Sequence, residues 1–249
     1  MKKSLLLLTC MVAAFTLHAQ VTKTIFITGG GLDKTFVNYI IALTKKPNPR
    51  ICFLPTASAD NPYAINMWYN LAQDLPMRPY VQRTFLNSSP DQKTFEENLL
   101  SMDAIVVGGG STLNMIAIWK AQGIDTVLRK AYEKGIVLAG GSAGSLCWFS
   151  GGYTDSRPKQ LSLVECLVFI PLSHCPHYHS EPTRKPLYQA AVLSGKLGPG
   201  YACDDDAGIL FEDGKLKKVV AENKDNNCYY ISVADGKIKE ELLPAEIIK

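Results

Sequence analysis

The chain of 249 residues carries little net charge and has no basic stripe. Lysine and arginine together number 26 against 23 aspartates and glutamates, a formal charge of +3, and without Lys2 and Lys3 it would be +1. Capture of a nucleic-acid backbone depends on clustered lysines and arginines. We therefore expect no nucleic-acid partner.

The sequence also lacks the short motifs of several cofactor and metal sites. It has no Cys-x-x-Cys pair, so a zinc ribbon or a thioredoxin-type site has no support. Its glycine runs, Gly29 to Gly31 and Gly108 to Gly110, lack both the Gly-Lys-Ser/Thr of a phosphate loop and the Gly-x-Gly-x-x-Gly of a dinucleotide site. We expect no cofactor and no bound metal.

Only one apolar run is long, and it lies at the N-terminus. Lys2 and Lys3 precede an apolar stretch from Leu5 to Leu17, which is followed by the small residue Ala19. A membrane-spanning helix needs about 20 apolar residues, more than this run provides, so the pattern is typical of a cleaved signal peptide. We expect residues 1–19 to be removed and the protein to be exported, periplasmic or secreted, with no stable membrane anchor.

Cysteines are few and do not form a clear disulfide framework. Six remain after residue 19, at positions 52, 147, 166, 175, 203 and 228. Export would permit disulfides. Several of the six nevertheless lie in apolar segments, where a free cysteine behaves as a small hydrophobic residue. We expect most of them to be unpaired core residues.

The remaining composition is that of an ordinary globular protein, with 47% hydrophobic and 20% charged residues. Residues 20–249 are enough for one sizeable core, and no repeat or Pro- or Ser-rich linker divides them. We expect a single domain over this range.

Short apolar runs alternate with stretches of helical spacing through the first two-thirds of the chain. Runs of β-branched residues without polar alternation are typical of strands buried on both faces. The expected strands are 24–28, 51–54, 81–86, 104–107 and 136–139, and the expected helices are 36–44, 64–71, 95–101, 112–121 and 124–134. This order predicts an α/β three-layer sandwich with a mostly parallel sheet and helices on both faces.

The sequence pattern changes after residue 207, from alternating strands and helices to strand pairs. Residues 208–211 and 216–221 form one hairpin signal, and residues 229–233 and 238–242 form a second. We expect both hairpins to build an antiparallel C-terminal edge on the same sheet.

The segment from Gly140 to Gly144 carries the clearest chemical signal. A buried strand enters Gly-x-Ser-x-Gly and then a helical stretch, the context of a nucleophile elbow. The sharp turn would project the Ser142 hydroxyl, and the following amide of Ala143 would stabilise an oxyanion at a helix N-terminus. The alternative is a phosphate-binding or packing turn with an incidental serine.

A serine nucleophile needs a base, and histidines are scarce. After the proposed signal peptide only His174, His177 and His179 remain. We choose His177, because Pro176 before it can aim the ring. A metal-binding histidine cluster is the alternative, but no carboxylate or cysteine constellation completes a ligand set.

The acid that would orient the imidazole is left open by spacing alone. Asp155, Glu181 and the run from Asp204 to Asp206 are all candidates. A second glycine run, Gly108 to Gly110, leaves a buried strand and enters a helix, so its amides are expected at the same sheet edge as Ser142.

Three segments together resemble a known family. They are Gly108-Gly109-Gly110-Ser111-Thr112, Gly141-Ser142-Ala143-Gly144 and Cys175-Pro176-His177-Tyr178. The combination resembles the serine peptidases of the dipeptidase E (aspartyl dipeptidase) and cyanophycinase family, whose fold is similar to class I glutamine amidotransferases.

The resemblance implies Ser142 as nucleophile, His177 as general base, and an oxyanion hole formed by Ala143 and Gly109. It implies Asp155 as the acid by analogy with dipeptidase E, and Asp205 as the alternative by analogy with cyanophycinase-like members. The implied activity is hydrolysis of short peptides, aspartyl dipeptides among them, although neither parent's specificity segment is clearly reproduced.

Two other functions are compatible with the motifs. An α/β-hydrolase esterase shares Gly-x-Ser-x-Gly, but the separation of 35 positions from Ser142 to His177 is shorter than that fold usually has. A non-catalytic peptide or sugar binder could use the same scaffold. The oligomeric state is open between monomer and homodimer.

Overall fold

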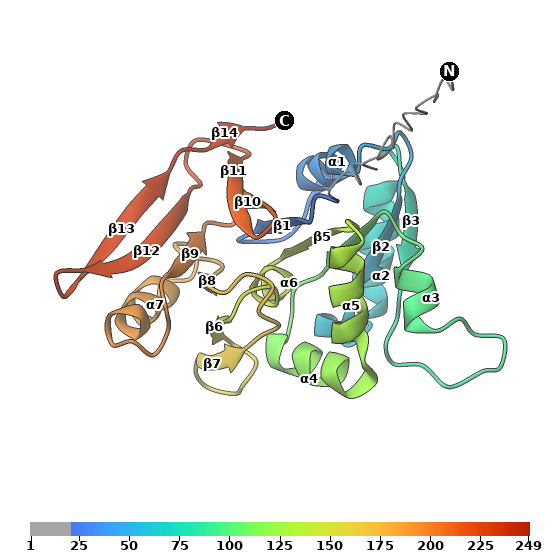
Figure 1. Ribbon diagram of the computed structural model, residues 1–249, viewed down its shortest axis with the longest axis horizontal. Coiled ribbons are helices and arrows are strands. Elements are labelled where there is room, and N and C mark those ends of the chain that lie inside the picture. The colour runs from blue at the N-terminus through green and yellow to red at the C-terminus, as the bar shows by residue number, and fades with distance from the viewer. Residues whose placement is uncertain (1–20) are drawn as a thin grey trace, which may run out of the picture.

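A computed structural model describes residues 21–249, so the expected signal peptide lies outside the described residues. The chain forms two sheets with helices packed around them (Figure 1). The larger sheet has the order β14-β11-β10-β1-β5-β4-β2-β3, and the smaller one has the order β13-β12-β9-β8-β6-β7.

The strands of the larger sheet are β1 (Thr24–Thr28), β2 (Arg50–Leu54), β3 (Arg78–Val81), β4 (Ala104–Val107), β5 (Val137–Gly141), β10 (Ala207–Glu212), β11 (Lys215–Ala221) and β14 (Glu246–Ile247). Strands β1 to β5 pair in parallel, and β10 and β11 continue the sheet as an antiparallel edge. Every residue of β1, β4 and β5 is buried, as expected for parallel strands covered on both faces. The predicted α/β architecture is confirmed.

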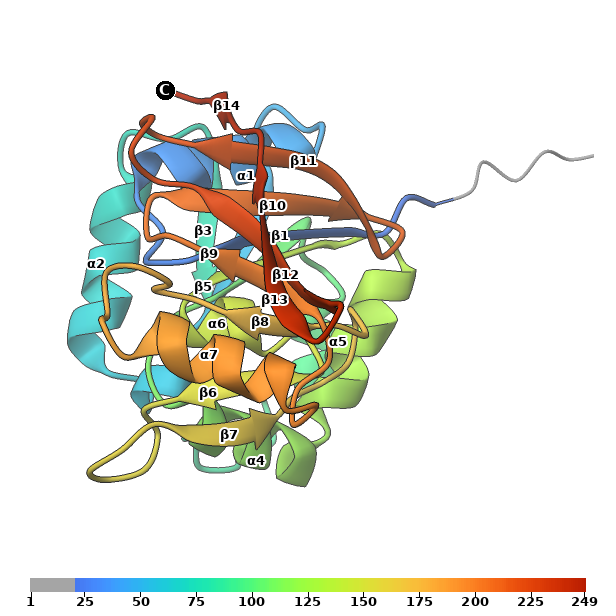
Figure 2. The same ribbon diagram turned by 90° about the vertical axis from the view of Figure 1, so that its left-hand side faces the viewer.

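Side chains of the central strands alternate between two layers of helices. Phe26 packs with α1 (Lys34–Leu43) and α2 (Pro62–Ala72). Its neighbours Ile25 and Ile27 belong to the cluster that covers the other face. That face carries α3 (Phe95–Leu99), α4 (Thr112–Gln122), α5 (Ile124–Glu133) and the short α6 (Ala143–Leu146), and a 3-10 turn, η1 (Thr56–Ser58), follows β2. Figure 2 shows α2 on one side of the molecule and α5 on the other.

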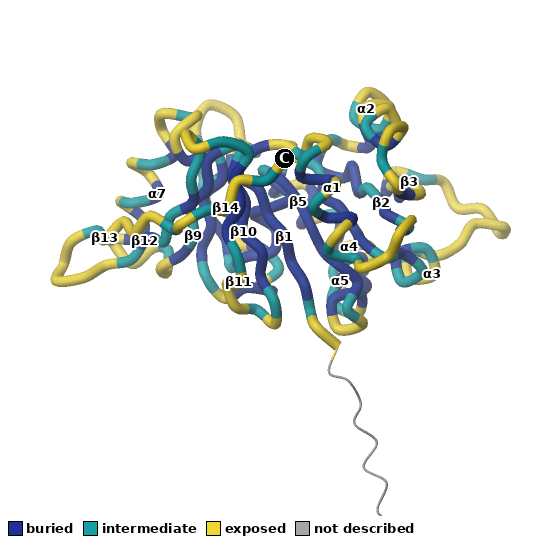
Figure 3. The backbone as a smooth tube through the Cα atoms, turned by 90° about the horizontal axis from the view of Figure 1, so that it is seen from above, coloured by how far each residue is buried: buried dark blue, intermediate teal, exposed yellow. Residues whose placement is uncertain are grey.

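The smaller sheet contains β6 (Gly151–Thr154), β7 (Ser162–Glu165), β8 (Ser173–Cys175), β9 (Gly200–Cys203), β12 (Cys228–Ala234) and β13 (Lys237–Leu243), with α7 (Arg184–Leu193) packed against it. The expectation that both C-terminal hairpins extend the main sheet is therefore wrong for the second one. Strand β12 pairs with β9, so the β12–β13 hairpin belongs to the smaller sheet. Its exposed tip projects away from the helices (Figures 1 and 3).

Strand β3 lies earlier than the predicted 81–86. The chain leaves the ladder after Val81 because the Asp60 carboxylate accepts the amides of Thr84 and Phe85, at 2.6 and 2.8 Å. Those amides are thus satisfied by a side chain instead of a neighbouring strand. The other expected strands and helices of the first two-thirds appear with ends shifted by a few residues.

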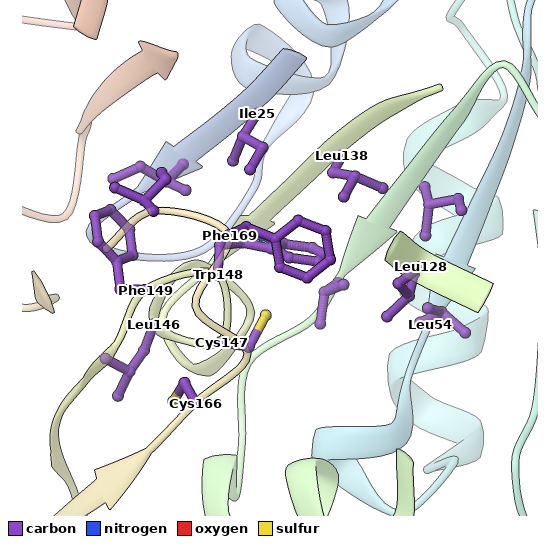
Figure 4. Packing of buried hydrophobic residues seen from close by; sticks show 14 of the residues in the cluster. Ile25, Leu54, Leu128, Leu138, Leu146, Cys147, Trp148, Phe149, Cys166 and Phe169 are labelled. Atoms are coloured by element: carbon purple, nitrogen blue, oxygen red, sulfur yellow. The ribbon is translucent and has the colours of Figure 1, made fainter. Parts of the chain in front are cut away.

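All six cysteines among residues 21–249 are buried free thiols, as predicted for most of them. Cys147 and Cys166 pack in the main core near Trp148 and Phe169 (Figure 4). The Cys228 and Cys203 sulfurs lie 3.1 Å apart on paired strands. None of the helices within the described range is long and apolar enough to cross a bilayer.

Candidate active site

Ser142 lies on the sharp turn between β5 and α6. Its backbone has φ 55° and ψ −118°, a conformation that residues other than glycine rarely adopt. Such strain at a strand-to-helix turn projects the side chain from the carboxyl end of the sheet. The predicted nucleophile elbow is present in this geometry.

The glycines around Ser142 allow backbones to approach closely. A Cβ on Gly144 would collide with the carbonyl oxygen of Val107 on β4, and one on Gly140 would collide with the Gly144 carbonyl. The turn is therefore locked between two parallel strands. This explains the small residues on either side of the serine.

His177 contacts Ser142 directly. The hydroxyl of Ser142 donates to His177 Nε2 over 2.8 Å, and His177 Nδ1 donates to Asp205 Oδ1 over 2.7 Å. Because the Nδ1 proton faces a carboxylate, Nε2 is left with a lone pair toward the serine. His177 also has a positive φ of 55°, so both ends of the serine–histidine contact come from unusual backbone turns.

The acid in contact with the imidazole is Asp205, not Asp155. Asp155 follows β6 and lies exposed in a surface depression with Arg157 and Lys159. Strand β8, which leads to the histidine, has β6 on one side and β9 on the other. After β8 the chain bends toward β9, because the Tyr178 amide donates to the Cys203 carbonyl over 3.1 Å. Because this bend turns His177 toward Asp205, the predicted contact of the histidine with Asp155 is wrong.

Glu181 is also engaged elsewhere. Its carboxylate accepts from Arg184 Nε over 2.6 Å, and that guanidinium is almost fully buried and donates in turn to the Tyr153 carbonyl over 2.9 Å. Glu181 thus anchors the start of α7.

Three successive aspartates have separate roles in the turn between β9 and β10. Asp204 is buried and accepts from His179 Nδ1 and from the Asn227 amide, at 2.8 and 2.9 Å. Asp205 faces His177 and also accepts from the Ser180 hydroxyl, at 2.9 Å. Asp206 lies near the side-chain amides of two asparagines, Asn223 and Asn226. The flanking contacts hold the middle carboxylate toward the histidine.

The first glycine run, Gly29 to Gly31, positions this turn. The Gly30 amide donates to the Asp205 carbonyl over 3.0 Å, and a Cβ on Gly29 would collide with the carbonyl of Asp204. Sequence reasoning treated this run only as an incomplete phosphate loop. The signal it missed is that a glycine run after a strand can also admit another backbone.

The other two histidines do not face the serine. His174 is fully buried, with Nδ1 donating to the Tyr201 carbonyl and Nε2 3.0 Å from the Ser145 hydroxyl. Burial lowers the pKa of His174 to about 3, so the ring is neutral. His179 is bound to Asp204. Within residues 21–249, no three histidine, cysteine or acidic side chains are grouped to hold a metal ion.

Two backbone amides are available beside Ser142. Ala143 is the first residue of α6, where helical amides have no partner within the helix. Gly109 lies in the loop after β4, where a Cβ would sit 3.3 Å from the Ser142 Cβ, and its amide has no hydrogen-bond partner in the described part of the chain. These two donors flank the serine as an oxyanion hole requires.

The site combines a strained serine with a histidine that can accept its proton. An acid contacts the histidine, and two free amides flank the serine. This is the arrangement of groups found in serine hydrolases. The sequence pattern of Peptidase family S51 matches residues 25–219. The chain belongs to this family, and it is a peptidase.

Known proteins similar to this chain agree with that assignment. An uncharacterized peptidase, YgaJ, from Bacillus subtilis (strain 168) is 39% identical over 210 residues, which cover 84% of this chain and 90% of that protein. The family assignment replaces the alternative of an α/β-hydrolase esterase.

Two crystal structures share the fold. A protein from Listeria monocytogenes EGD-e, named as a candidate peptidase E, matches with a TM-score of 0.62 and 17% identity over 81% of this chain and 100% of its own. A peptidase from an acI-B1 Actinobacterium matches with a TM-score of 0.69 and 14% identity over 92% of this chain and 97% of its own.

Proposed function

We propose that this chain hydrolyses short peptides through Ser142 as nucleophile, His177 as general base and Asp205 as the acid that orients the imidazole. The observation that carries the proposal is the pair of hydrogen bonds from Ser142 to His177 and from His177 to Asp205, at 2.8 and 2.7 Å. The preference for short peptides follows from the resemblance to dipeptidase E.

In the proposed reaction, Ser142 Oγ attacks the peptide carbonyl carbon while its proton passes to His177 Nε2. The amides of Ala143 and Gly109 stabilise the negative charge on the carbonyl oxygen. His177 then gives its proton to the departing amine, and the C–N bond breaks to leave an ester on Ser142. A water molecule, deprotonated by His177, hydrolyses that ester and restores the hydroxyl.

The contact between His177 and Asp205 supports this sequence of proton transfers. The Asp205 carboxylate holds the Nδ1 proton in place and stabilises the imidazolium that forms. The His177 side chain is 18% exposed and that of Asp205 is 40% exposed, so the site is open to water and to a substrate.

The direct test is a mass-spectrometric screen of a dipeptide and short-peptide library that includes α- and β-aspartyl members. We expect cleavage by the wild-type protein and none above background by Ser142→Ala. A matched variant, Ser89→Ala, replaces an exposed serine of a remote loop and should keep full activity. Cleavage that survives in Ser142→Ala would refute the proposed nucleophile.

We also propose that the protein is exported after removal of residues 1–19. The proposal rests on the sequence pattern of two lysines, a short apolar run and Ala19. N-terminal sequencing of the protein from a periplasmic or secreted fraction should begin at Gln20. Recovery of the full-length chain in the cytosol alone would contradict export.

A further inference from the structure

An apolar cavity of about 230 Å³ adjoins the loop that carries Gly109. Phe53 of β2 and Trp68 of α2 form one wall, with their rings stacked at a centroid distance of 5.5 Å. Gly108, Gly109 and Gly141, the residue before Ser142, line the end nearest the site. The cavity is smaller than those that hold drug-sized ligands, and its volume is suited to a single side chain.

Helix α2 lines the cavity with one face. Ala64, Met67, Trp68 and Leu71 all contribute, and these positions follow the i, i+3, i+4, i+7 spacing of one helical stripe. Met67 is half exposed at the mouth, whereas Trp68 is buried. No lining residue carries a charge, and all the side chains that line it are apolar.

The position of the cavity determines which part of a substrate can enter it. His177 delivers a proton to the departing amine, so the leaving group must lie on its side of Ser142. His177 and Asp205 approach from beyond β1, because the Asp205 turn is bound to Gly30. The cavity begins at Gly31 and Leu32 after β1 and extends in the opposite direction along the sheet, to β4 and β2. Its deeper part therefore lies on the side of Ser142 away from His177, next to the proposed oxyanion donor Gly109.

We propose that this cavity receives the side chain of the residue whose carbonyl is attacked, and that it selects an uncharged aliphatic or aromatic side chain there. The inference rests on the proposed function, since it names the substrate class of the same site. An aspartate side chain in this cavity would lose its water without gaining a cationic or polar side chain as a partner, which is unfavourable. On the acyl side, this proposal therefore differs from the aspartyl preference that the family resemblance implies.

The test compares dipeptides X-Ala in which X is Leu, Phe, Ala or Asp. We expect kcat/KM to be about 100-fold higher for Leu or Phe than for Asp, and about tenfold or more higher than for Ala. An Asp substrate cleaved as fast as Leu or faster would overturn the inference.

Two variants of α2 test the cavity itself. Met67→Lys places an ammonium group at the mouth, and we expect it to lower the Leu-to-Asp ratio of kcat/KM at least tenfold. Ala64→Phe fills the cavity, and we expect it to slow Leu and Phe substrates while sparing Ala. The matched control, Tyr69→Lys, adds the same charge to an exposed position of α2 outside the cavity and should leave the ratio unchanged. A ratio unaffected by Met67→Lys, or equally affected by Tyr69→Lys, would contradict the assignment.

A second readout separates failure of this inference from failure of the proposed function. Aminoalkyl boronic acids form a bond from boron to a nucleophilic serine oxygen without any cleavage, so they report the subsite directly. We expect the leucine-like boronate to protect Ser142 from a serine-directed reagent at about 100-fold lower concentration than the aspartate-like one. Reaction with the opposite preference would overturn the subsite alone, whereas a Ser142 that reacts with no reagent would overturn the proposed function and the subsite with it.

Discussion

The two halves of the site differ in how far apart in sequence their parts lie. Ser142 and the Ala143 amide come from one local turn on the parallel sheet, and Gly109 follows the neighbouring strand. His177 and Asp205, by contrast, are 28 residues apart and meet only because β8 and β9 pair and the chain then crosses from the smaller sheet to β10. The serine half can be recognised from short sequence motifs, whereas the histidine–aspartate half is formed only by strand pairing.

The strongest test of this comparison removes one residue from each half. We expect His177→Ala to lower kcat by about 10⁶-fold, the same order as Ser142→Ala, because neither group works without the other. The double variant should be no slower than either single variant. Losses that multiply in the double variant would show that the two halves act independently. Thermal midpoints within a few degrees of wild type would confirm that each variant is folded.

The next test distinguishes the two acids. Asp205→Asn should lower kcat by about 10⁴-fold, since an amide in that place favours the wrong imidazole tautomer. Asp155→Asn, the matched change at the acid that sequence reasoning preferred, should stay within about twofold of wild type because its side chain is exposed and away from His177. A larger loss of kcat in Asp155→Asn than in Asp205→Asn would instead identify Asp155 as the acid that orients His177.

A smaller effect is expected from the packing of the Ser142 turn, and it is measured as a change in the free energy of unfolding. Gly144→Ala forces a methyl group against the Val107 carbonyl, and we expect a loss of about 2–3 kcal/mol in the free energy of unfolding. Gly198→Ala, in the smaller-sheet half, meets open space and should change the free energy by less than about 0.5 kcal/mol. Urea denaturation measures both, and a Gly144→Ala protein as stable as wild type would show that the turn is not locked.

The smallest expected effect is on the pH dependence of stability, and it comes from Glu222, which follows β11 near the Asp205 turn. Burial, followed by the nearby carboxylates of Asp33 and Asp206, raises the pKa of Glu222 from 4.5 to about 7. The folded state therefore holds a proton that the unfolded state releases, so the stabilisation is full below about pH 4.5 and is lost as the pH rises through 7.

Glu222→Gln should remove that part of the pH dependence and raise the thermal midpoint at pH 8 by about one or two degrees relative to wild type. The matched variant Glu165→Gln alters an exposed residue of β7 and should not change the pH profile. Parallel wild-type and Glu222→Gln profiles from pH 5 to 8 would disprove the role of this carboxyl.

Local sequence identified most of the parallel half. Four- and five-residue apolar runs predicted β1, β4 and β5 because a strand buried on both faces has no polar alternation. The same reasoning placed β3 too late, because the carboxylate of Asp60 takes the amides of residues 84 and 85 and no local pattern reveals a contact over 24 residues. The short β8 has three residues, too few for any periodicity to predict it.

By itself, the sequence determined the proposed nucleophile and limited the proposed base to a few side chains. Gly-x-Ser-x-Gly after a buried strand admits one nucleophile, and the scarcity of histidine left three possible bases. Which acid contacts the histidine was decided by the tertiary structure, because Asp155 and Asp205 follow strands on opposite sides of β8. A single backbone hydrogen bond, from the Tyr178 amide to the Cys203 carbonyl, turns the histidine toward Asp205. The cavity beside Gly109 was decided in the same way, since its walls come from β2, β4, β5, α2 and the segment after β1 and exist only once the sheet has assembled.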